Sequence, residues 1–273
     1  MMHQLAHRLA VSSGALITFL QRMLNCGEVK RLARCSVALV LSGFIPCSPL
    51  LEQISRSIRR RQNDDGGWHD VEESLWAAKL LSIYSPEFDI AVARTLHFII
   101  AQRAATGAWG QSCRDTARIP QTSLVSHFFP EISDACSLRW LTSEWAADVS
   151  SETSLTYKGG FFLLGAQKAS SATEVDRLIN ETTLFIQREQ NDDGGFGPWK
   201  DHPIGSDPWS TGVVLWGLSR WIDRVDKSVV ERALAWLEKT QLPSGYWPYH
   251  YLDEGTSYAL IGAVSALKAL QRL

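Results

Sequence analysis

Four segments of this chain repeat a glutamine that is followed, within a few residues, by a glycine and an aromatic residue. QNDDGGW and QNDDGGF differ only at the aromatic position, QLPSGYW keeps the three key residues, and QRAATGAWG is a weaker copy. The copies begin at Gln62, Gln190, Gln241 and Gln102, and in chain order they are 40, 88 and 51 residues apart. Such spacing predicts similar supersecondary units, with one degenerate unit in the long interval, where we expect Ser137 to Trp145 to end a helix.

The residues around these copies predict two kinds of helix. Segments 87–102, 173–190 and 226–241 alternate charged and apolar residues at helical spacing, which is typical of half-exposed helices. Segments that follow a copy are apolar or small around their whole circumference, which indicates buried helices. The pattern predicts outer helices at 4–24, 47–61, 87–102, 133–146, 173–190 and 226–241. It predicts inner helices at 28–43, 72–84, 120–128, 153–168, 208–221 and 255–271.

Six alternating pairs predict an all-α fold, an (α/α)6 barrel made of a double ring of outer and inner helices. We expect residues 1–273 to form a single domain, because a chain of this length can bury one large core. Asn-Asp-Asp-Gly-Gly suits a helix end where the chain reverses, since these residues tolerate positive φ. The aromatic residue of each copy can pack between helices, so we interpret Trp68, Trp109, Phe196 and Trp247 as scaffold.

Composition argues against several classes of function. The formal net charge is -2 and the only basic run is Arg59 to Arg61, so we expect no nucleic-acid partner. Five scattered cysteines without a Cys-x-x-Cys spacing predict neither a disulfide framework nor a zinc ribbon, and they favour a cytoplasmic protein. The apolar run 37–45 is shorter than the roughly 20 residues of a membrane span. Peripheral membrane contact stays open, because an apolar substrate would arrive from lipid, and the oligomeric state is not indicated.

Glutamine with Gly-Gly-Trp, repeated between alternating helices, resembles the QW motif of the squalene-hopene cyclase and prenyltransferase repeat family. The resemblance covers 62–273 directly and the earlier residues through helix count alone. The segment GAWGQSC, at 107–113, is similar to a stretch near the end of bacterial squalene-hopene cyclases. The resemblance implies one β-type barrel domain of a class II terpene cyclase, without the second barrel of full-length cyclases and without a cofactor.

Class II cyclases of this family protonate an alkene with the middle Asp of a D-x-D-D-T signature at the start of an inner helix. At the expected place this chain has DPWST, at 207–211, and its final repeat has DEGTS, at 253–257, so the middle acid is missing from both. DVEES, at 70–74, keeps the whole pattern if Glu replaces Asp and Ser replaces Thr. The resemblance therefore implies Glu72 as the catalytic acid, with Asp70 and Glu73 as the catalytic neighbours that tune it.

A purely structural interpretation of these acids also stays open. Asp70, Asp207 and Asp253 each come just before or at the start of a predicted inner helix. Aspartate at such a position is a common N-cap, and acids in a first helical turn interact favourably with the helix dipole. The prenyltransferase branch of the family binds zinc through an Asp-x-Cys pair and a later His, but those positions hold Trp209 and Thr256, so no metal is expected.

Aromatic residues gather near the predicted starts of the inner helices, where they would bind an apolar chain and stabilise a cation. We expect the substrate to contact Tyr157, Trp209, Tyr249, Tyr251 and Tyr258, with Trp76 and Phe161 deeper. Asp207, Asp253, Asp115 and Arg118 complete the predicted substrate-binding set, the last two as a polar wall for an anionic or carbonyl group. Ordinary packing and a solvated loop are the alternatives for these residues.

These features predict a small terpene cyclase-like enzyme that cyclises an isoprenoid or another apolar unsaturated substrate, by acid initiation or by the shape of the cavity. Because the D-x-D-D signature is incomplete, we expect a substrate that needs less acidity than a bare alkene, such as an epoxide, carbonyl, imine or reactive polyene. Two alternatives stay open: a non-catalytic barrel that binds a lipid or peptide, and a prenyltransferase-like subunit.

Overall fold

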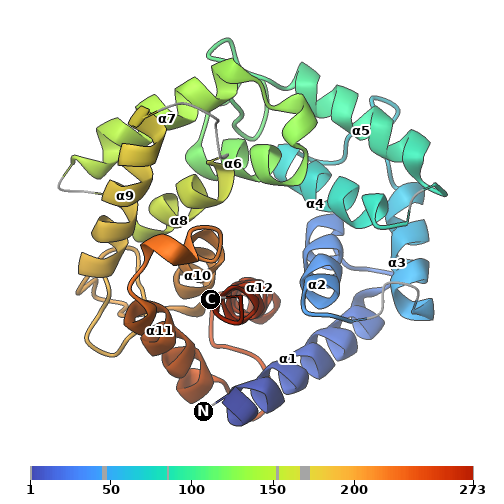
Figure 1. Ribbon diagram of the computed structural model, residues 1–273. Helices are drawn as coiled ribbons and strands as arrows, with labels where there is room; N and C mark the ends of the chain where they lie inside the picture. Colours follow the sequence, from blue (N-terminus) through green and yellow to red (C-terminus); the bar gives the residue numbers. More distant parts are fainter. Residues whose placement is uncertain (1, 45–47, 85, 152–153, 167–172, 273) are drawn as a thin grey trace.

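The computed structural model describes residues 2–44, 48–84, 86–151, 154–166 and 173–272. Within these ranges the chain forms α-helices in two concentric rings and contains no strand (Figure 1). The outer ring consists of α1 (Met2–Met23), α3 (Pro49–Arg60), α5 (Asp89–Ala101), α7 (Ala135–Val149), α9 (Thr173–Arg188) and α11 (Lys227–Thr240). The inner ring consists of α2 (Val29–Leu41), α4 (Val71–Ser82), α6 (Ile119–Phe128), α8 (Thr156–Gly165), α10 (Pro208–Leu218) and α12 (Leu252–Leu270).

The predicted fold class is confirmed, and each of the twelve predicted helices corresponds to one helix of the described residues. Two short 3-10 helices, Pro130–Ile132 and Ile222–Arg224, lie in connections. Some predicted boundaries, at 47, 153 and 167–168, lie outside the described residues, as does Cys47. None of the described helices is long and apolar enough to cross a membrane.

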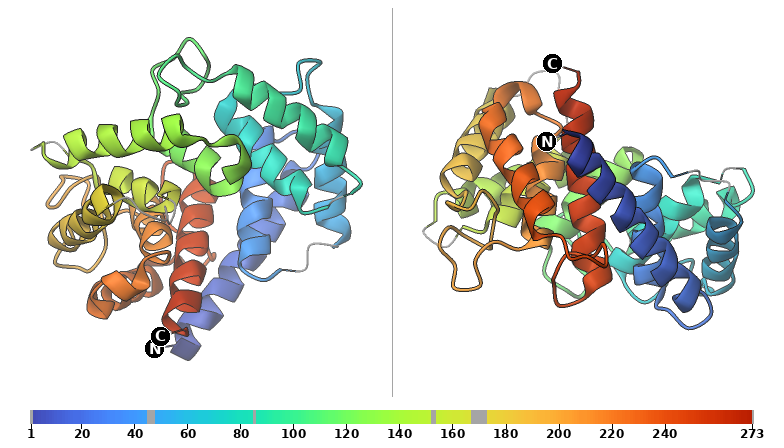
Figure 2. Two further views of the ribbon diagram at one scale, coloured as in Figure 1. Left: turned by 45° about the horizontal axis from the view of Figure 1, so that its top comes forward. Right: turned by 90° about the horizontal axis from the view of Figure 1, so that it is seen from below.

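The alternation between rings gives the barrel two different ends. Each outer helix leads into an inner helix, so the inner helices run in the same direction and their N-terminal ends meet at one end of the barrel (Figure 2). Helix α1 packs against α11 and α12, which closes the outer ring beside the last helices of the chain (Figure 1). Residues at the start of every inner helix therefore share one end of the molecule.

The repeated segments form the turns that carry the chain from the outer ring to the inner ring. Gly66, Gly107, Gly194 and Gly245 have φ between 86° and 92°, a conformation that favours glycine. The indole nitrogens of three copies donate to a carbonyl ten residues earlier, on the outer helix that the chain has just left. These bonds run from Trp68 to Ile58 (3.1 Å), from Trp109 to Ile99 (2.8 Å) and from Trp247 to Leu237 (2.7 Å).

The glutamine of the motif links two consecutive outer helices. Nε2 of Gln190 donates to the Gly194 carbonyl of its own turn and to the Val229 carbonyl of α11, each at 2.8 Å. Gln62 makes the equivalent bonds to α5, and Gln241 makes them to α1, which closes the ring. Since these bonds satisfy carbonyls at helix ends and between helices, the motif is a structural clamp.

Two of the expected repeat units differ from the prediction. In the second copy Arg103, not Gln102, occupies the clamp position: its Nε donates to the Gly107 carbonyl at 2.7 Å and its Nη1 to Asp134 of α7 at 2.9 Å. Ser137 to Trp145 lie in α7, as predicted, but the helix continues to Val149, four residues past Trp145. Trp145 instead links α7 to α9 by donating to Thr182 Oγ1 at 2.7 Å.

Helices α8, α10 and α12 are in contact at backbone distance because glycines face each other. A Cβ added to Gly217 of α10 would lie 2.2 Å from the carbonyl oxygen of Gly160 on α8. One added to Gly262 of α12 would lie 2.1 Å from that of Gly212 on α10. No side chain fits at these crossings, so this part of the inner ring is narrow.

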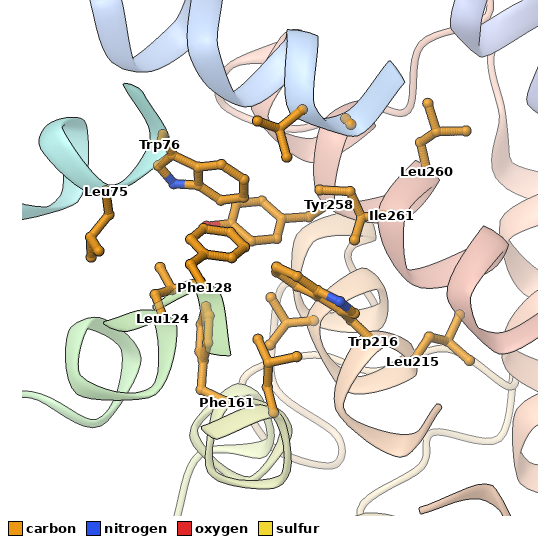
Figure 3. Packing of buried hydrophobic residues seen from close by; sticks show 14 of the residues in the cluster. Leu75, Trp76, Leu124, Phe128, Phe161, Leu215, Trp216, Tyr258, Leu260 and Ile261 are labelled. Carbon is orange, nitrogen blue, oxygen red and sulfur yellow. The ribbon is translucent and has the colours of Figure 1, made fainter. Parts of the chain in front are cut away.

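Four aromatic side chains fill the axis of the inner ring, and we call Trp76, Phe128, Trp216 and Tyr258 the aromatic layer (Figure 3). The Trp76 ring contacts those of Phe128 and Tyr258 at centroid distances of 5.1 and 6.0 Å, and Phe128 contacts Trp216 at 6.0 Å. All four side chains are buried. The barrel is therefore blocked midway, and a ligand that enters at one end cannot pass through it.

Candidate active site

A cavity of about 590 Å³ opens at the end of the barrel where the inner helices begin. Its size is that of a typical small-molecule site. Tyr258 of the aromatic layer lies at its base, and side chains from α4, α6, α7, α8, α10 and α12 form its walls. The lining residues are Glu72, Ala117, Arg118, Ile119, Pro120, Gln121, Leu124, Glu144, Tyr157, Lys158, Phe161, Trp209, Tyr249, Glu254 and Tyr258.

Two glutamates line the cavity from either side of helix α2. Glu72 lies in the first turn of α4 and Glu254 in the first turn of α12, and their cation partners belong to α2. Lys30 Nζ lies 3.4 Å from Glu72 Oε2, and Arg34 Nη1 donates to Glu254 Oε1 at 2.9 Å. Burial lowers the pKa of Lys30, but attraction from Glu72 and Asp70 outweighs it, so the net pKa shift is upward. The Lys30 side chain is therefore charged at neutral pH.

Asp253 lies next to Glu254 but belongs to a different set of contacts. Arg31 Nε donates to it at 3.1 Å, Arg34 lies 3.5 Å away, and the carboxylate is only 2% exposed. The expectation that Asp253 caps the helix is wrong, since Tyr251 is the N-cap of α12 and makes no side-chain capping bond. Asp253 does not line the cavity either, so it holds α2 and α12 together instead of meeting a ligand.

The predicted acid cluster at 70–74 is divided by the structure. Asp70 Oδ1 accepts from the Glu73 amide at 2.7 Å and so caps α4. Glu73 accepts from the amides of His69 and Lys30, both at 2.9 Å, which joins the start of α4 to the start of α2. Only Glu72 of the three carboxylates lines the cavity. The geometry thus favours structural roles for Asp70 and Glu73 and leaves Glu72 available to a ligand.

The hydroxyl of the D-x-x-x-[ST] pattern also has a structural partner in this chain. Oγ of Ser74 accepts from the Trp68 amide at 3.0 Å, and Thr256 accepts from the Trp247 amide at 3.0 Å. Thr211 makes the same bond with the amide of Phe196. This shared bond sets the register of the repeats: Glu254 corresponds to Glu72, whereas aligning Asp253 with Asp207 is off by one residue.

Asp207 caps α10, as the structural interpretation expected. Its Oδ1 accepts from the Ser210 amide at 2.8 Å, and its Oδ2 accepts from the Ser210 hydroxyl at 2.7 Å. Burial raises the pKa of Asp207, and the bonds from Ser210 offset only part of this increase. Asp207 does not line the cavity, so its predicted contact with substrate has no geometric support.

The opposite wall of the cavity is aromatic and is centred on Trp209. Its ring contacts Tyr157 at a centroid distance of 5.0 Å, Tyr258 at 5.5 Å and Phe161 at 6.0 Å. Tyr249 lies parallel to Trp209 at 6.4 Å. The structure therefore brings together the predicted residues Tyr157, Phe161, Trp209 and Tyr258. Aromatic faces arranged in this way suit an apolar chain or a cation.

Two other predicted aromatic residues lie outside the cavity. Trp76 belongs to the aromatic layer and is completely buried beneath the cavity base. Tyr251 is 59% exposed and packs on the Arg31 guanidinium, whose central carbon is 5.4 Å from the ring centroid. Neither side chain lines the cavity.

The third wall is polar and begins at helix α6. Arg118 lines the cavity and pairs with Asp115 at 3.1 Å, while Asp115 itself lies outside the lining. The amide of Gln111, with Arg118 and Thr116, lowers the pKa of Asp115. Gln121, Glu144 and Lys158 complete this wall.

The sequence analysis missed four residues that line the cavity, Gln121, Glu144, Lys158 and Glu254, and the two cations paired with its glutamates, Lys30 and Arg34. An alignment based on Thr256 would have found Glu254, because it holds the position of Glu72 in its repeat. Helix α2 carries no such signal, since no copy of the turn motif precedes it. Among the residues that the structure describes, no group of three His, Cys, Asp or Glu side chains could hold a metal ion.

The fold defines a class of protein, the (α/α)6 barrels, and the cavity lies where the inner helices begin. No family model matches the sequence, and no curated protein matches it. Among solved structures, the chain is similar to the type II terpene cyclase MstE from Scytonema in complex with geranylgeranyl dihydroxybenzoate, its substrate. A variant of that enzyme superimposes with a TM-score of 0.75 at 15% identity, over 98% of this chain and 100% of that chain.

Other solved structures share the barrel as well. A protein from Actinoplanes matches with a TM-score of 0.69 at 12% identity, over 95% of this chain and 99% of that one. A possible member of the GH105 family from Salmonella enterica matches with a TM-score of 0.62 at 11% identity, over 94% and 93%. At these identities the similarity establishes the fold, and function must be argued from the site.

Proposed function

We propose that this chain is a type II terpene cyclase-like enzyme that closes rings in an isoprenoid or another apolar unsaturated substrate. The observation that carries the proposal is the composition of the cavity, in which the carboxyl group of Glu72, one of three glutamates in the lining, shares the same space as Trp209, Tyr157 and Phe161. An acid with aromatic rings around it is what a carbocation cyclisation requires. The similarity to MstE supports a substrate of this kind.

In the proposed reaction Glu72 is the catalytic acid. Its O–H bond breaks and the proton forms a new bond to the substrate, at an epoxide oxygen, a carbonyl oxygen or an activated double bond. The electron pair of a second double bond then attacks the electron-deficient carbon and closes a ring. The final cation loses a proton to a base in the cavity, so the product is an isomer of the substrate. The proton then passes from that base back to Glu72 through solvent, which restores the starting state of the enzyme.

Neighbouring residues have supporting roles in this proposal. The Lys30 ammonium, 3.4 Å from Glu72, would stabilise the carboxylate left after proton transfer. Asp70 and Glu73 would act as positioning residues, because they bond the backbone amides at the start of α4. Trp209 and its aromatic partners would stabilise the positive charge as it moves along the substrate. The aromatic layer would limit how far the substrate extends.

The test is turnover of candidate substrates, followed by mass spectrometry and NMR of the products. We would incubate the purified protein with geranylgeranyl dihydroxybenzoate and with polyprenyl epoxides of several lengths, and look for a product of unchanged mass with fewer double bonds. Glu72→Gln should reduce turnover at least 100-fold, the lower limit of general acid catalysis being about 10²-fold. Asp70→Asn, which keeps the capping oxygen, is the matched control and should retain most activity.

Two results would overturn the proposal. If Glu72→Gln cyclises a substrate as fast as the parent protein, Glu72 is not the acid. If none of the substrates is converted although one binds with micromolar affinity, the barrel is not a cyclase for this class of compound.

The paired carboxylates of the cavity favour a second candidate, a barrel that binds a lipid without converting it. Glu72 and Glu254 each have a cation within 3.4 Å, so both carboxyl groups already have a partner before any ligand enters. An aromatic cavity of this kind is suited to hold an apolar molecule. Mass spectrometry of ligands extracted from the purified protein distinguishes the two candidates, because a binder would release its ligand unchanged after prolonged incubation.

A further inference from the structure

A second cavity, of about 410 Å³, lies at the other end of the barrel. The C-terminal ends of α2, α6, α10 and α12 form it, and Trp216 of the aromatic layer contributes to its lining. Tyr258 of the same layer lines the first cavity. The two cavities are therefore separated by the aromatic layer and are distinct sites.

The second cavity is lined by basic side chains. His127, Arg220, Lys268 and Arg272 line it, and no aspartate or glutamate is among its lining residues. None of the ion pairs between described residues includes Arg220, Lys268 or Arg272. On a chain whose formal net charge is -2, such a group of cations without nearby carboxylates creates a local positive potential.

Helix dipoles explain only part of this charge. The C-terminal ends of helices carry partial negative charge, and a nearby cation compensates it. Lys268 does so directly, since its Nζ donates to the Leu41 carbonyl at 2.8 Å. Among the described residues the Arg220 guanidinium bonds no carbonyl and has His127 as its hydrogen-bond partner, at 3.3 Å between Nη1 and Nδ1. Its remaining guanidinium donors are free for a ligand.

His127 is neutral at neutral pH and orients the Arg220 guanidinium by accepting a hydrogen bond from it. Burial and the charges of Arg220 and Lys79 lower the pKa of His127 to about 3, so its ring is neutral. Its Nδ1 then accepts from Arg220, and the proton is held on Nε2. This bond occupies Nη1 on one edge of the Arg220 guanidinium, and donors on another edge can bind an oxyanion.

We propose that this second cavity binds a phosphate or diphosphate group, held by Arg220 and Lys268. A planar guanidinium matches the geometry of phosphate oxygens, and the neighbouring ammonium adds a second charge-assisted donor. The group could belong to a free phosphorylated molecule or to the head group of an anionic lipid. Neither Arg220 nor Lys268 takes part in the proposed cyclase reaction.

The test is isothermal titration calorimetry of the full chain with sodium pyrophosphate at constant ionic strength. We expect binding at one site per chain, and at least a tenfold loss of affinity in the double variant Arg220→Gln, Lys268→Gln. Arg139→Gln is the matched control, because it removes an exposed arginine of outer helix α7 and should leave the affinity unchanged. The single variant Arg220→Gln keeps the Lys268 bond to Leu41, so a loss of affinity in it cannot result from the loss of that bond. We expect this variant to bind more weakly as well.

A second arm separates the two sources of the group. If the source is a lipid head group, vesicles of phosphatidylcholine with phosphatidic acid should bind the parent protein. The same vesicles should not bind the Arg220→Gln variant. Pyrophosphate binding without vesicle binding would identify a free phosphorylated ligand. Absence of both kinds of binding, or equal binding by the double variant and the parent protein, would overturn the proposal. Because binding is measured without turnover, failure here leaves the proposed cyclase reaction unaffected.

Discussion

Arg34 of α2 donates a hydrogen bond of 2.9 Å to Glu254 of α12, although 220 positions separate the two residues in the sequence. Arg34 and the neighbouring Asp253 are both 2% exposed, so their charges depend on each other for stabilisation. The hydrogen bond between Arg34 and Glu254 joins inner helices α2 and α12 at the edge of the first cavity. It therefore connects the stability of the barrel with the shape of the candidate active site.

Replacing Arg34 should destabilise the protein strongly. Arg34→Met removes a cation from buried Asp253 and partly exposed Glu254, and breaking a buried pair typically costs about 3 to 5 kcal/mol. Arg31 still contacts Asp253, so we expect a value near the lower end. The free energy of unfolding from urea titration measures the effect. Arg177→Met, which breaks an exposed pair with Glu181, should cost about 1 kcal/mol or less, and equal costs would contradict the prediction.

The clamp glutamines should contribute more to stability than a glutamine outside the clamp position. Gln190→Ala removes two bonds to backbone carbonyls and leaves them buried, at about 1 to 3 kcal/mol for each unsatisfied group. Gln102→Ala removes one bond, from the exposed Cys113 amide, and should cost less than about 1 kcal/mol. Thermal unfolding of both variants would show the order. A larger loss for Gln102→Ala would mean that Arg103 does not hold the clamp position.

Replacing glycine by alanine should have opposite effects on stability at a helix crossing and at an open position of an outer helix. Gly262→Ala places a methyl group 2.1 Å from the Gly212 carbonyl oxygen, so α10 and α12 must separate, and we expect a loss of about 3 kcal/mol or more. Gly14→Ala lies in α1 with nothing within 4 Å, and it should stabilise the protein by about 0.5 to 1 kcal/mol. Denaturant midpoints measure both. Similar midpoints for the two variants would exclude close packing at Gly262.

His127 should make stability depend on pH below neutrality. Its ordinary pKa of 6.5, which applies to the unfolded chain, falls to about 3 in the folded protein. Between these values the unfolded state binds more protons, so stability is complete above pH 6.5 and decreases as the pH falls towards 3. His127→Gln should remove this component from urea unfolding measured across the range. His97→Gln, on the exposed side of α5, should keep it, and loss of the slope in both variants would contradict the assignment.

The helices and their rings could be predicted from the sequence because the relevant signals are local. A helix that is half exposed shows its apolar residues at helical spacing, as in 226–241, and a buried helix is apolar on all sides. The turn motif, with glycine at positive φ after Asn or Asp, marks the helix ends. The end of α7 was predicted at 146, three residues before Val149, because no copy of the turn motif follows this helix to mark where it stops.

The candidate site was predicted in part, and the missing part is explained by distance along the chain. Tyr157, Trp209 and Tyr258 follow the starts of inner helices, so the repeat itself indicates their location. Arg34 and Lys30 lie on α2, which no turn motif precedes, and their partners are on helices far along the chain. No local pattern records which cation will face which carboxylate.

The sequence by itself determined that the chain alternates six outer and six inner helices, because helical spacing and turn chemistry depend on neighbouring residues. Only the tertiary structure decided which acids meet the cavity. Asp70, Glu72 and Glu73 are adjacent in the chain, yet two of them bond backbone amides and one lines the cavity. Successive residues of a helix point in different directions, and the helices packed around α4 determine which direction leads to the ligand.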